Sequence, residues 1–312
     1  MKMQTGLTGE YNLVVTRPDG STTETGWFKN LILDQGLDRI GISGNVINYC
    51  QIGTGTTAPS FTQTSLQSYT AGCQNTSISV VNAGSPTYSS AHTIAYPFAQ
   101  GAVVGNMAEI GVGWLATGNN LFSRALITDS GGNPTTITVT SIDQLTVYYK
   151  ITFIPDLNIG TGQVILAGST YDYVSSLAYA GSVYSANGLF VGYDFYSPGY
   201  GAGSPYAAAP ASTTTLGPNT TGLTNEQSFG VNGQFGPQGS TAAYINNTYY
   251  RDTTWFVPVG IVNFTGGIGG VRPVFGSYPG DTGYYKYIFT PAIPKDNTKT
   301  FSLTFRISWA RA

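Results

Sequence analysis

This 312-residue chain has few side chains that could serve in catalysis: one histidine, two cysteines and 15 acidic residues. Its one histidine, His92, lies in the strand-like run SSAHTIAYP, and no nucleophile-elbow sequence accompanies it. We interpret His92 as a surface or hydrogen-bonded core residue, and we predict no catalytic residue and no enzyme. A carboxylate pair needs no histidine, so a glycan-degrading enzyme stays open as a less favoured alternative. Its candidate acids are the aspartates and Glu10, Glu24, Glu109 and Glu226.

The chain also has few residues of the kinds that bind metals and cofactors. Cys50 and Cys73 are widely spaced, and with one histidine they cannot complete an ordinary structural zinc site. The run GTGTTAP at 53–59 lacks the closing Gly-Lys-Ser/Thr and the following helix of a phosphate-binding loop. We therefore predict no metal and no cofactor. We also expect both thiols to stay reduced, because the chain is expected to fold in a cytoplasm.

Two charged residues, Glu109 and Arg124, stand out because each is embedded in apolar or small sequence, MAEIGVGW and LFSRALI. An unpaired charge in such a setting is costly when it is buried. We predict that Glu109 and Arg124 form a structural ion pair with each other.

Tyrosines are concentrated in the second half of the chain, among glycines and prolines. Tyrosine offers a rigid face and a hydrogen-bonding tip, which suit protein partners or sugar rings. Packing of sheet faces and subunit contacts is the favoured interpretation. The candidate partner or glycan contacts are Tyr193, Tyr196, Tyr200, Tyr206, Tyr249, Tyr250, Tyr284 and Tyr285.

Composition narrows the fold class and the partners. Only 9% of residues are charged, against about 25% in average soluble domains, while 41 Gly and 22 Tyr favour strands and turns. A net charge of −2 and a pI near 5.3 supply no basic surface for nucleic acid. No apolar run reaches membrane-spanning length, and the first residues do not have the pattern of a secretory signal. We expect an all-β protein without a membrane span.

Strands are the elements that must position these residues. Five apolar residues between 145 and 153 alternate with polar ones, the period of two of a half-buried strand. The final strand repeats this pattern, residues 77–94 predict a hairpin, and residues 33–40 have the spacing of one short helix. We expect an antiparallel β-sandwich, jelly-roll or immunoglobulin-like, with a second β-rich region. The alternating residues are Leu145, Val147, Tyr149, Ile151 and Phe153, then Phe301, Leu303, Phe305, Ile307 and Trp309.

The hydrophobic pattern and the composition change along the chain and suggest three parts. Residues 1–155 are predicted to be a β-sandwich anchoring domain, and 297–312 a C-terminal strand. Residues 156–296 are either a Gly/Tyr-rich β domain or a large insertion from which the last strand returns to the first sheet. Within them, residues 197–222 lack any hydrophobic period and predict a long exposed loop.

Several segments, taken in order, resemble structural proteins of tailed bacteriophages, especially those of the tail, tail tip or fibre. They are GWFKNLILDQGLDRIG, YCQIGTGTTAPSFTQTSL, AEIGVGWLATGNNLFSRALITD with LTVYYKITF, and the closing LTFRISWAR. The resemblance covers mainly residues 20–155 and the last dozen. It implies a β-rich virion component, assembled in the host cytoplasm, and it carries no catalytic residue.

The resulting expectation is a virion structural protein that acts through contacts with other virion proteins and with copies of itself. Homo-oligomerisation follows because few charges cover the surface and strand edges need partners. The alternatives are a protein that binds host-surface glycan or decorates a capsid. We expect residues 1–155 and the C-terminal strand to anchor the chain in the particle, and residues 156–296 to face outward or toward a partner.

Overall fold

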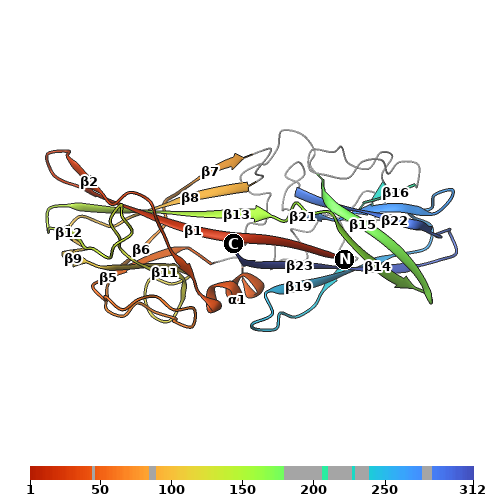
Figure 1. Cartoon of the computed structure of the whole chain (residues 1–312), viewed down its shortest axis with the longest axis horizontal. Coiled ribbons are helices and arrows are strands. Elements are labelled where there is room, and N and C mark those ends of the chain that lie inside the picture. Colours follow the sequence, from red (N-terminus) through yellow and green to blue (C-terminus); the bar gives the residue numbers. More distant parts are fainter. Residues whose placement is uncertain (44–45, 84–88, 179–205, 210–226, 229–238, 276–282) are drawn as a thin grey trace.

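The computed structural model describes residues 1–43, 46–83, 89–178, 206–209, 227–228, 239–275 and 283–312. Within these residues the chain is built of β-strands and one short helix, so the all-β fold class is confirmed. The molecule is elongated, and the strands β1, β13 and β23 run along its long axis (Figure 1).

Sheet A is the largest sheet and carries these long strands, in the order β18-β19-β23-β1-β13-β8-β7, with β2 and β3 also paired to β1. All of its pairings are antiparallel except that between β1 and β23, which is parallel. Its strands are β1 (Lys2–Thr16), β2 (Thr22–Glu24), β3 (Phe28–Lys29), β7 (Ser77–Ala83), β8 (Ser89–Pro97), β13 (Gln144–Pro155), β18 (Gly239–Thr241), β19 (Tyr250–Val257) and β23 (Phe301–Arg311).

Three further sheets complete the described fold. Sheet B has the order β4-β11-β10-β5-β6, sheet C pairs β12 with β9, and sheet E has the order β14-β15-β22-β20-β16-β17 with β21 beside β22. The strands of sheets B and C are β4 (Leu31–Ile32), β5 (Tyr49–Gly53), β6 (Tyr69–Gln74), β9 (Gly105–Met107), β10 (Glu109–Gly113), β11 (Leu121–Leu126) and β12 (Ile137–Val139). Those of sheet E are β14 (Gly160–Leu166), β15 (Ser169–Ala178), β16 (Tyr206–Ala208), β17 (Gln227–Ser228), β20 (Ile268–Arg272), β21 (Val274–Phe275) and β22 (Gly283–Ile293).

Sheet A is shared by two sandwich halves. In one half it packs on sheet B, where the Tyr11 hydroxyl lies 2.8 Å from Ser123 Oγ of β11. In the other half it packs on sheet E, where the Tyr287 hydroxyl donates to the Lys2 carbonyl at 2.9 Å and the Tyr287 ring contacts Phe305. Sheets B and E accordingly lie toward opposite ends of the long axis (Figure 1). One continuous apolar core runs through both halves.

The strand predicted at residues 145–153 is confirmed as part of β13. All five of its apolar side chains are buried, and the residues between them are half-buried. In addition, β13 pairs with β1 along twelve residues, from Thr5 opposite Pro155 to Thr16 opposite Gln144. The period of two therefore marks the central strand pair of sheet A.

The short helix expected near residues 33–40 is observed as α1 (Asp34–Ile42), which buries Leu37 and Ile40. It can lie close to β11 because Gly36 has no side chain: a Cβ there would come within 2.2 Å of the Phe122 carbonyl oxygen. The C-terminal strand fixes the other side of the helix, since Trp309 Nε1 donates to the Leu37 carbonyl at 2.8 Å.

The second half of the chain contributes to both layers. Strand β23 returns to sheet A beside β1, and β19, from within residues 156–296, extends the same sheet. Most of the predicted loop at 197–222 lies outside the described residues. Residues 206–208, however, form β16, and Ala207 is fully buried. At those three residues the chain forms a strand and not the predicted loop, because β16 pairs with β20, and Ala207 belongs to the core.

Candidate functional site

The structure brings Glu109 and Arg124 together inside sheet B. Glu109 begins β10 and Arg124 lies on the neighbouring strand β11, two residues from Leu126, which is directly opposite Glu109; the pairing therefore puts both side chains on the same face of the sheet. Arg124 donates from Nη2 and Nε to Glu109 Oε2 at 2.7 and 3.0 Å, and both side chains are 0% exposed. This arrangement neutralises two charges that the fold removes from water.

Backbone groups of residues 54–68 complete the surroundings of the Glu109 carboxylate. Its oxygens accept from the amides of Gly55, Gln67 and Ser68 at 3.0, 2.9 and 2.6 Å. A Cβ at Gly55 would lie 2.3 Å from Glu109 Oε1, so glycine permits this approach. Arg124 also donates to the same segment, at Gln63 Oε1 and the Thr57 carbonyl. The ion pair therefore ties the connection between β5 and β6 to the sheet, which is a structural role.

The remaining candidate carboxylates are separated from this pair. Glu10 forms an ion pair with Lys150 at 2.6 Å, and Glu24 accepts from Asn12 Nδ2 at 3.3 Å. Glu226 lies outside the described residues.

The candidate contact tyrosines do not form one described surface. Tyr193, Tyr196 and Tyr200 lie outside the described residues, and for Tyr206 and Tyr284 only the strand position is described. Tyr249 is half-buried against the core, and the Arg306 guanidinium lies 3.5 Å from the centroid of the half-buried Tyr250 ring.

Tyr285 is a correction to the predicted contact residues. Its side chain is buried, and its hydroxyl donates to the Asp156 carbonyl at 2.8 Å. The alternation of β22 turns it toward the core between sheets A and E, so it is not available to a partner in this fold.

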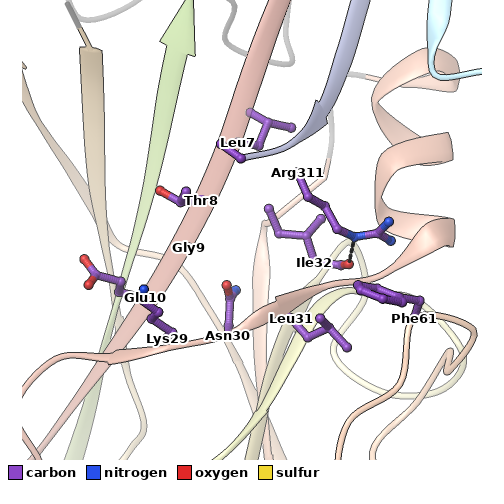
Figure 2. A pocket seen from close by; sticks show the side chains of 11 residues that line it. Leu7, Thr8, Gly9, Glu10, Lys29, Asn30, Leu31, Ile32, Phe61 and Arg311 are labelled. Atoms are coloured by element: carbon purple, nitrogen blue, oxygen red, sulfur yellow. Dashed lines mark hydrogen bonds between the residues drawn. The ribbon is translucent and has the colours of Figure 1, made fainter. Parts of the chain in front are cut away.

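A pocket with a volume of about 410 Å³ lies beside β1, where the neighbour of β1 in sheet A changes from β23 to β3. The last residue pair between β1 and β23 is Leu7 with Arg311, whereas pairing with β3 begins at Glu10 with Lys29. Thr8 and Gly9 lie between these two pairings, and the pocket opens beside them (Figure 2). The hollow is thus a consequence of where two strands end.

Asn30 provides a polar group in the wall of this pocket. Its carboxamide lies against Gly9, where a Cβ would come within 2.5 Å of Oδ1. Nδ2 donates to the Tyr149 hydroxyl at 3.2 Å. Within the described residues, Oδ1 is buried and has no hydrogen-bond partner. A buried amide oxygen without a partner is an unusual and costly feature of a folded protein.

Arg311 forms the opposite wall. Its Nε donates to the Ile32 carbonyl at 2.6 Å, its Nη2 to Asp34 Oδ1 at 2.5 Å, and its guanidinium lies 4.1 Å from the Phe61 ring centroid (Figure 2). The sequence did not single out Asn30, Phe61 or Arg311. They meet only through long-range strand pairing, which no local pattern indicates.

Burial favours the neutral forms of His92, Cys50 and Cys73. Burial lowers the pKa of His92 to about 4, and Ser90 Oγ lies 3.0 Å from its Nε2. Both thiols are free, and Cys50 and Cys73 lie directly opposite each other on β5 and β6. Burial raises the pKa of Cys73 to about 12 and that of Cys50 well above its usual range. None of these groups is poised as a nucleophile or base near neutral pH.

The described residues contain neither a metal-binding cluster nor a membrane-spanning helix. No group of three or more His, Cys, Asp or Glu side chains is arranged to hold a metal ion. No helix in that part of the chain is long and apolar enough to cross a membrane.

Comparisons with protein-family models, with curated proteins and with solved structures gave no match.

Proposed function

We propose that this chain is a structural protein of a tailed-phage virion that acts through contacts made by the open edges of its sheets. The observation that carries the assembly role is β7, at the edge of sheet A. Within the described residues β7 pairs only with β8, so its other side presents backbone donors and acceptors to a neighbour.

The side chains of β7 suit a contact better than they suit water. Ile78 is 51% and Val81 69% exposed, and because they are three residues apart they lie on opposite faces of the strand. The sequence of the strand, SISVVNA, has no charged residue. Edge strands that stay unpaired are commonly protected by lysine, proline or bulges, and an uncharged apolar edge is a template for another strand. A neighbouring chain that adds a strand here would cover the edge.

A second open edge strengthens the assembly role. Strand β14, at the edge of sheet E, pairs only with β15 in the described part of the chain, and its Ile165 is 69% exposed. Two uncharged edges on different sheets allow each copy to contact more than one neighbour. The virion setting rests on the resemblance of residues 20–155 and the last dozen residues to tail, tail-tip and fibre proteins.

The assembly proposal is tested by placing charge on the β7 edge. We expect the wild-type chain to form oligomers in multi-angle light scattering at high concentration, and we expect the double variant Ile78→Lys/Val81→Lys to shift toward monomer. Val259→Lys is the control, since it removes a valine that is 52% exposed from a turn, where there is no strand edge. A monomeric wild-type chain, or equal association of both variants, would refute assembly through β7.

The virion setting is tested separately by imaging. Antibody labelling of phage particles that carry this chain should locate it on the tail, tail tip or fibre. Its absence from purified particles would refute the virion role even where the edges associate.

A further inference from the structure

We infer that the pocket beside Thr8 and Gly9 binds one saccharide unit, a ring that carries several hydroxyl groups. The inference goes beyond the proposed function, because it concerns a different surface and does not depend on the strand edges. Its volume of about 410 Å³ lies in the range of small-molecule sites, which is about 300 to 1,000 Å³.

The Asn30 carboxamide favours a ligand with hydroxyl groups. Its terminal torsion is broad and roughly two-fold, so rotation about the Cβ–Cγ bond can turn either the amide oxygen or the amide nitrogen toward the pocket. A hydroxyl can donate to the oxygen or accept from the nitrogen, and it therefore satisfies Asn30 in either orientation. Oδ1 is buried as it stands, so this rotation must occur before a ligand hydroxyl can supply the partner that it lacks.

The charged side chains around the pocket favour a neutral ligand over an anion. Glu10 and Lys29 lie on one side and Arg311 on the other (Figure 2). Glu10 is paired with Lys150 and Arg311 with Asp34, so two of these charges are already compensated. The pocket thus offers donors and acceptors together, the combination that a polyhydroxylated ring can use, and Lys29 alone supplies less positive charge than the cation clusters that select phosphate.

Apolar groups supply the remaining contact. The buried side chains of Leu7 and Ile32 form part of the lining, and the exposed Phe61 stands at the pocket with Leu31 beside it. A sugar ring presents C–H groups between its hydroxyls, and these can pack on aliphatic and aromatic surface.

An exposed aromatic ring lies close to the same site. Lys150 Nζ is 2.6 Å from Glu10 Oε2 and 4.4 Å from the centroid of the Trp27 ring. Trp27 is 44% exposed, so a ring bound beside Glu10 could be followed by a second sugar against the indole.

Saturation-transfer NMR on the full chain tests this inference. The probes are glucose, galactose, mannose and N-acetylglucosamine, with glycerol as a control for unspecific hydroxyl binding. We expect at least one sugar, and not glycerol, to receive saturation, with a dissociation constant on the order of 1 mM. No transfer to any of the four sugars would overturn the inference.

Three variants locate the binding. Asn30→Leu keeps the volume but removes the polar group, and Glu10→Gln removes a rim charge; each should weaken sugar binding by about tenfold. Glu24→Gln is the matched control, because it changes a glutamate on neighbouring β2 that does not line the pocket. Melting temperatures check folding, and if Asn30→Leu does not fold, Glu10→Gln decides alone.

Binding that is equal in wild type, Glu10→Gln and any folded Asn30→Leu would place the sugar elsewhere and refute the pocket. The Ile78→Lys/Val81→Lys variant should bind sugar as the wild type does. The saccharide inference and the assembly proposal can therefore be refuted independently of each other.

Discussion

At the scale of single residues, the buried ion pair is the feature with the largest consequence. Glu109 accepts hydrogen bonds from three backbone amides as well as from Arg124, so its charge is compensated from several directions. The net contribution of such a pair to stability is small, because desolvation of the two charges offsets much of their attraction. Removing one member, however, leaves the other charge buried without its partner.

We expect Arg124→Met to lower the free energy of unfolding by about 3 to 5 kcal/mol, measured by urea denaturation. The double variant Glu109→Gln/Arg124→Met removes both charges and should recover about 1 kcal/mol or more of that loss. Lys299→Met, which breaks the exposed pair with Asp296, is the control and should have little effect. A double variant less stable than Arg124→Met would show that the uncompensated charge is not the cause.

His92 should make stability depend on pH. Its pKa is about 4 in the folded chain, against an ordinary value of about 6.5, because burial disfavours the charged ring. Between these values the unfolded chain binds the proton and the folded chain does not, so the free energy of unfolding falls as pH falls. We expect a loss of about 2 kcal/mol from about pH 7 to about pH 5.

The control for this titration is His92→Gln, which keeps a polar side chain beside Ser90 but does not titrate. Its urea-unfolding free energy should be flatter over the same pH range. Carboxylates whose pKa values hydrogen bonds lower, such as Asp143 and Asp129, lose their contribution only at more acidic pH. An equal slope in both proteins would assign the dependence to other groups.

At the scale of elements, helix α1 depends on close approach. Gly36 and Gly41 have no side chain where α1 meets Phe122 and Tyr244, respectively. Helix propensity alone favours alanine over glycine by about 1 kcal/mol, so the packing requirement opposes the local preference. The helix is therefore positioned by its neighbours, and its own sequence contributes little to its stability.

We expect Gly36→Ala to destabilise the protein by about 1 to 3 kcal/mol in urea unfolding, because a Cβ would collide with the Phe122 backbone. Ile42→Ala, at an exposed position of the same helix, is the control and should change stability by less than about 0.5 kcal/mol. Stabilisation by Gly36→Ala would mean that the helix moves away from β11 at no cost.

At the scale of the whole molecule, the two sandwich halves share their central strands. Both β1 and β13 belong to sheet A, whose core residues continue from the contact with sheet B to the contact with sheet E. If one half unfolded alone, β1 and β13 would lose part of their pairing, and the apolar core of the other half would be exposed to water. We therefore expect the chain to unfold in one cooperative transition.

Single tryptophans report on the two halves. The variant Trp27→Phe/Trp255→Phe/Trp309→Phe keeps Trp114, which directly follows β10 of sheet B, and Trp27→Phe/Trp114→Phe/Trp309→Phe keeps Trp255 on β19. Within each variant, the urea midpoint from fluorescence should equal that from far-ultraviolet circular dichroism. A separation of the two midpoints in either variant would show that one half unfolds before the other.

The sequence by itself determined the fold class and the main strands. Alternation at residues 145–153 and 301–309 predicted β13 and β23 because one face of each strand is buried, and helical spacing predicted α1. Apolar surroundings also identified Glu109 and Arg124 as buried charges that need each other. These features follow from local periodicity and the cost of burying charge, which neighbouring residues reveal.

Only the tertiary structure decided which strands are neighbours. The parallel pairing of β1 with β23 joins residues about as far apart as the chain allows, and the pocket beside Gly9 forms where β23 and β3 both end beside β1. Tyr285 points into the core for the same reason, because sheet E packs on sheet A there. A period of two shows that a strand has a buried face, but the partner that covers that face is chosen by packing across the whole molecule.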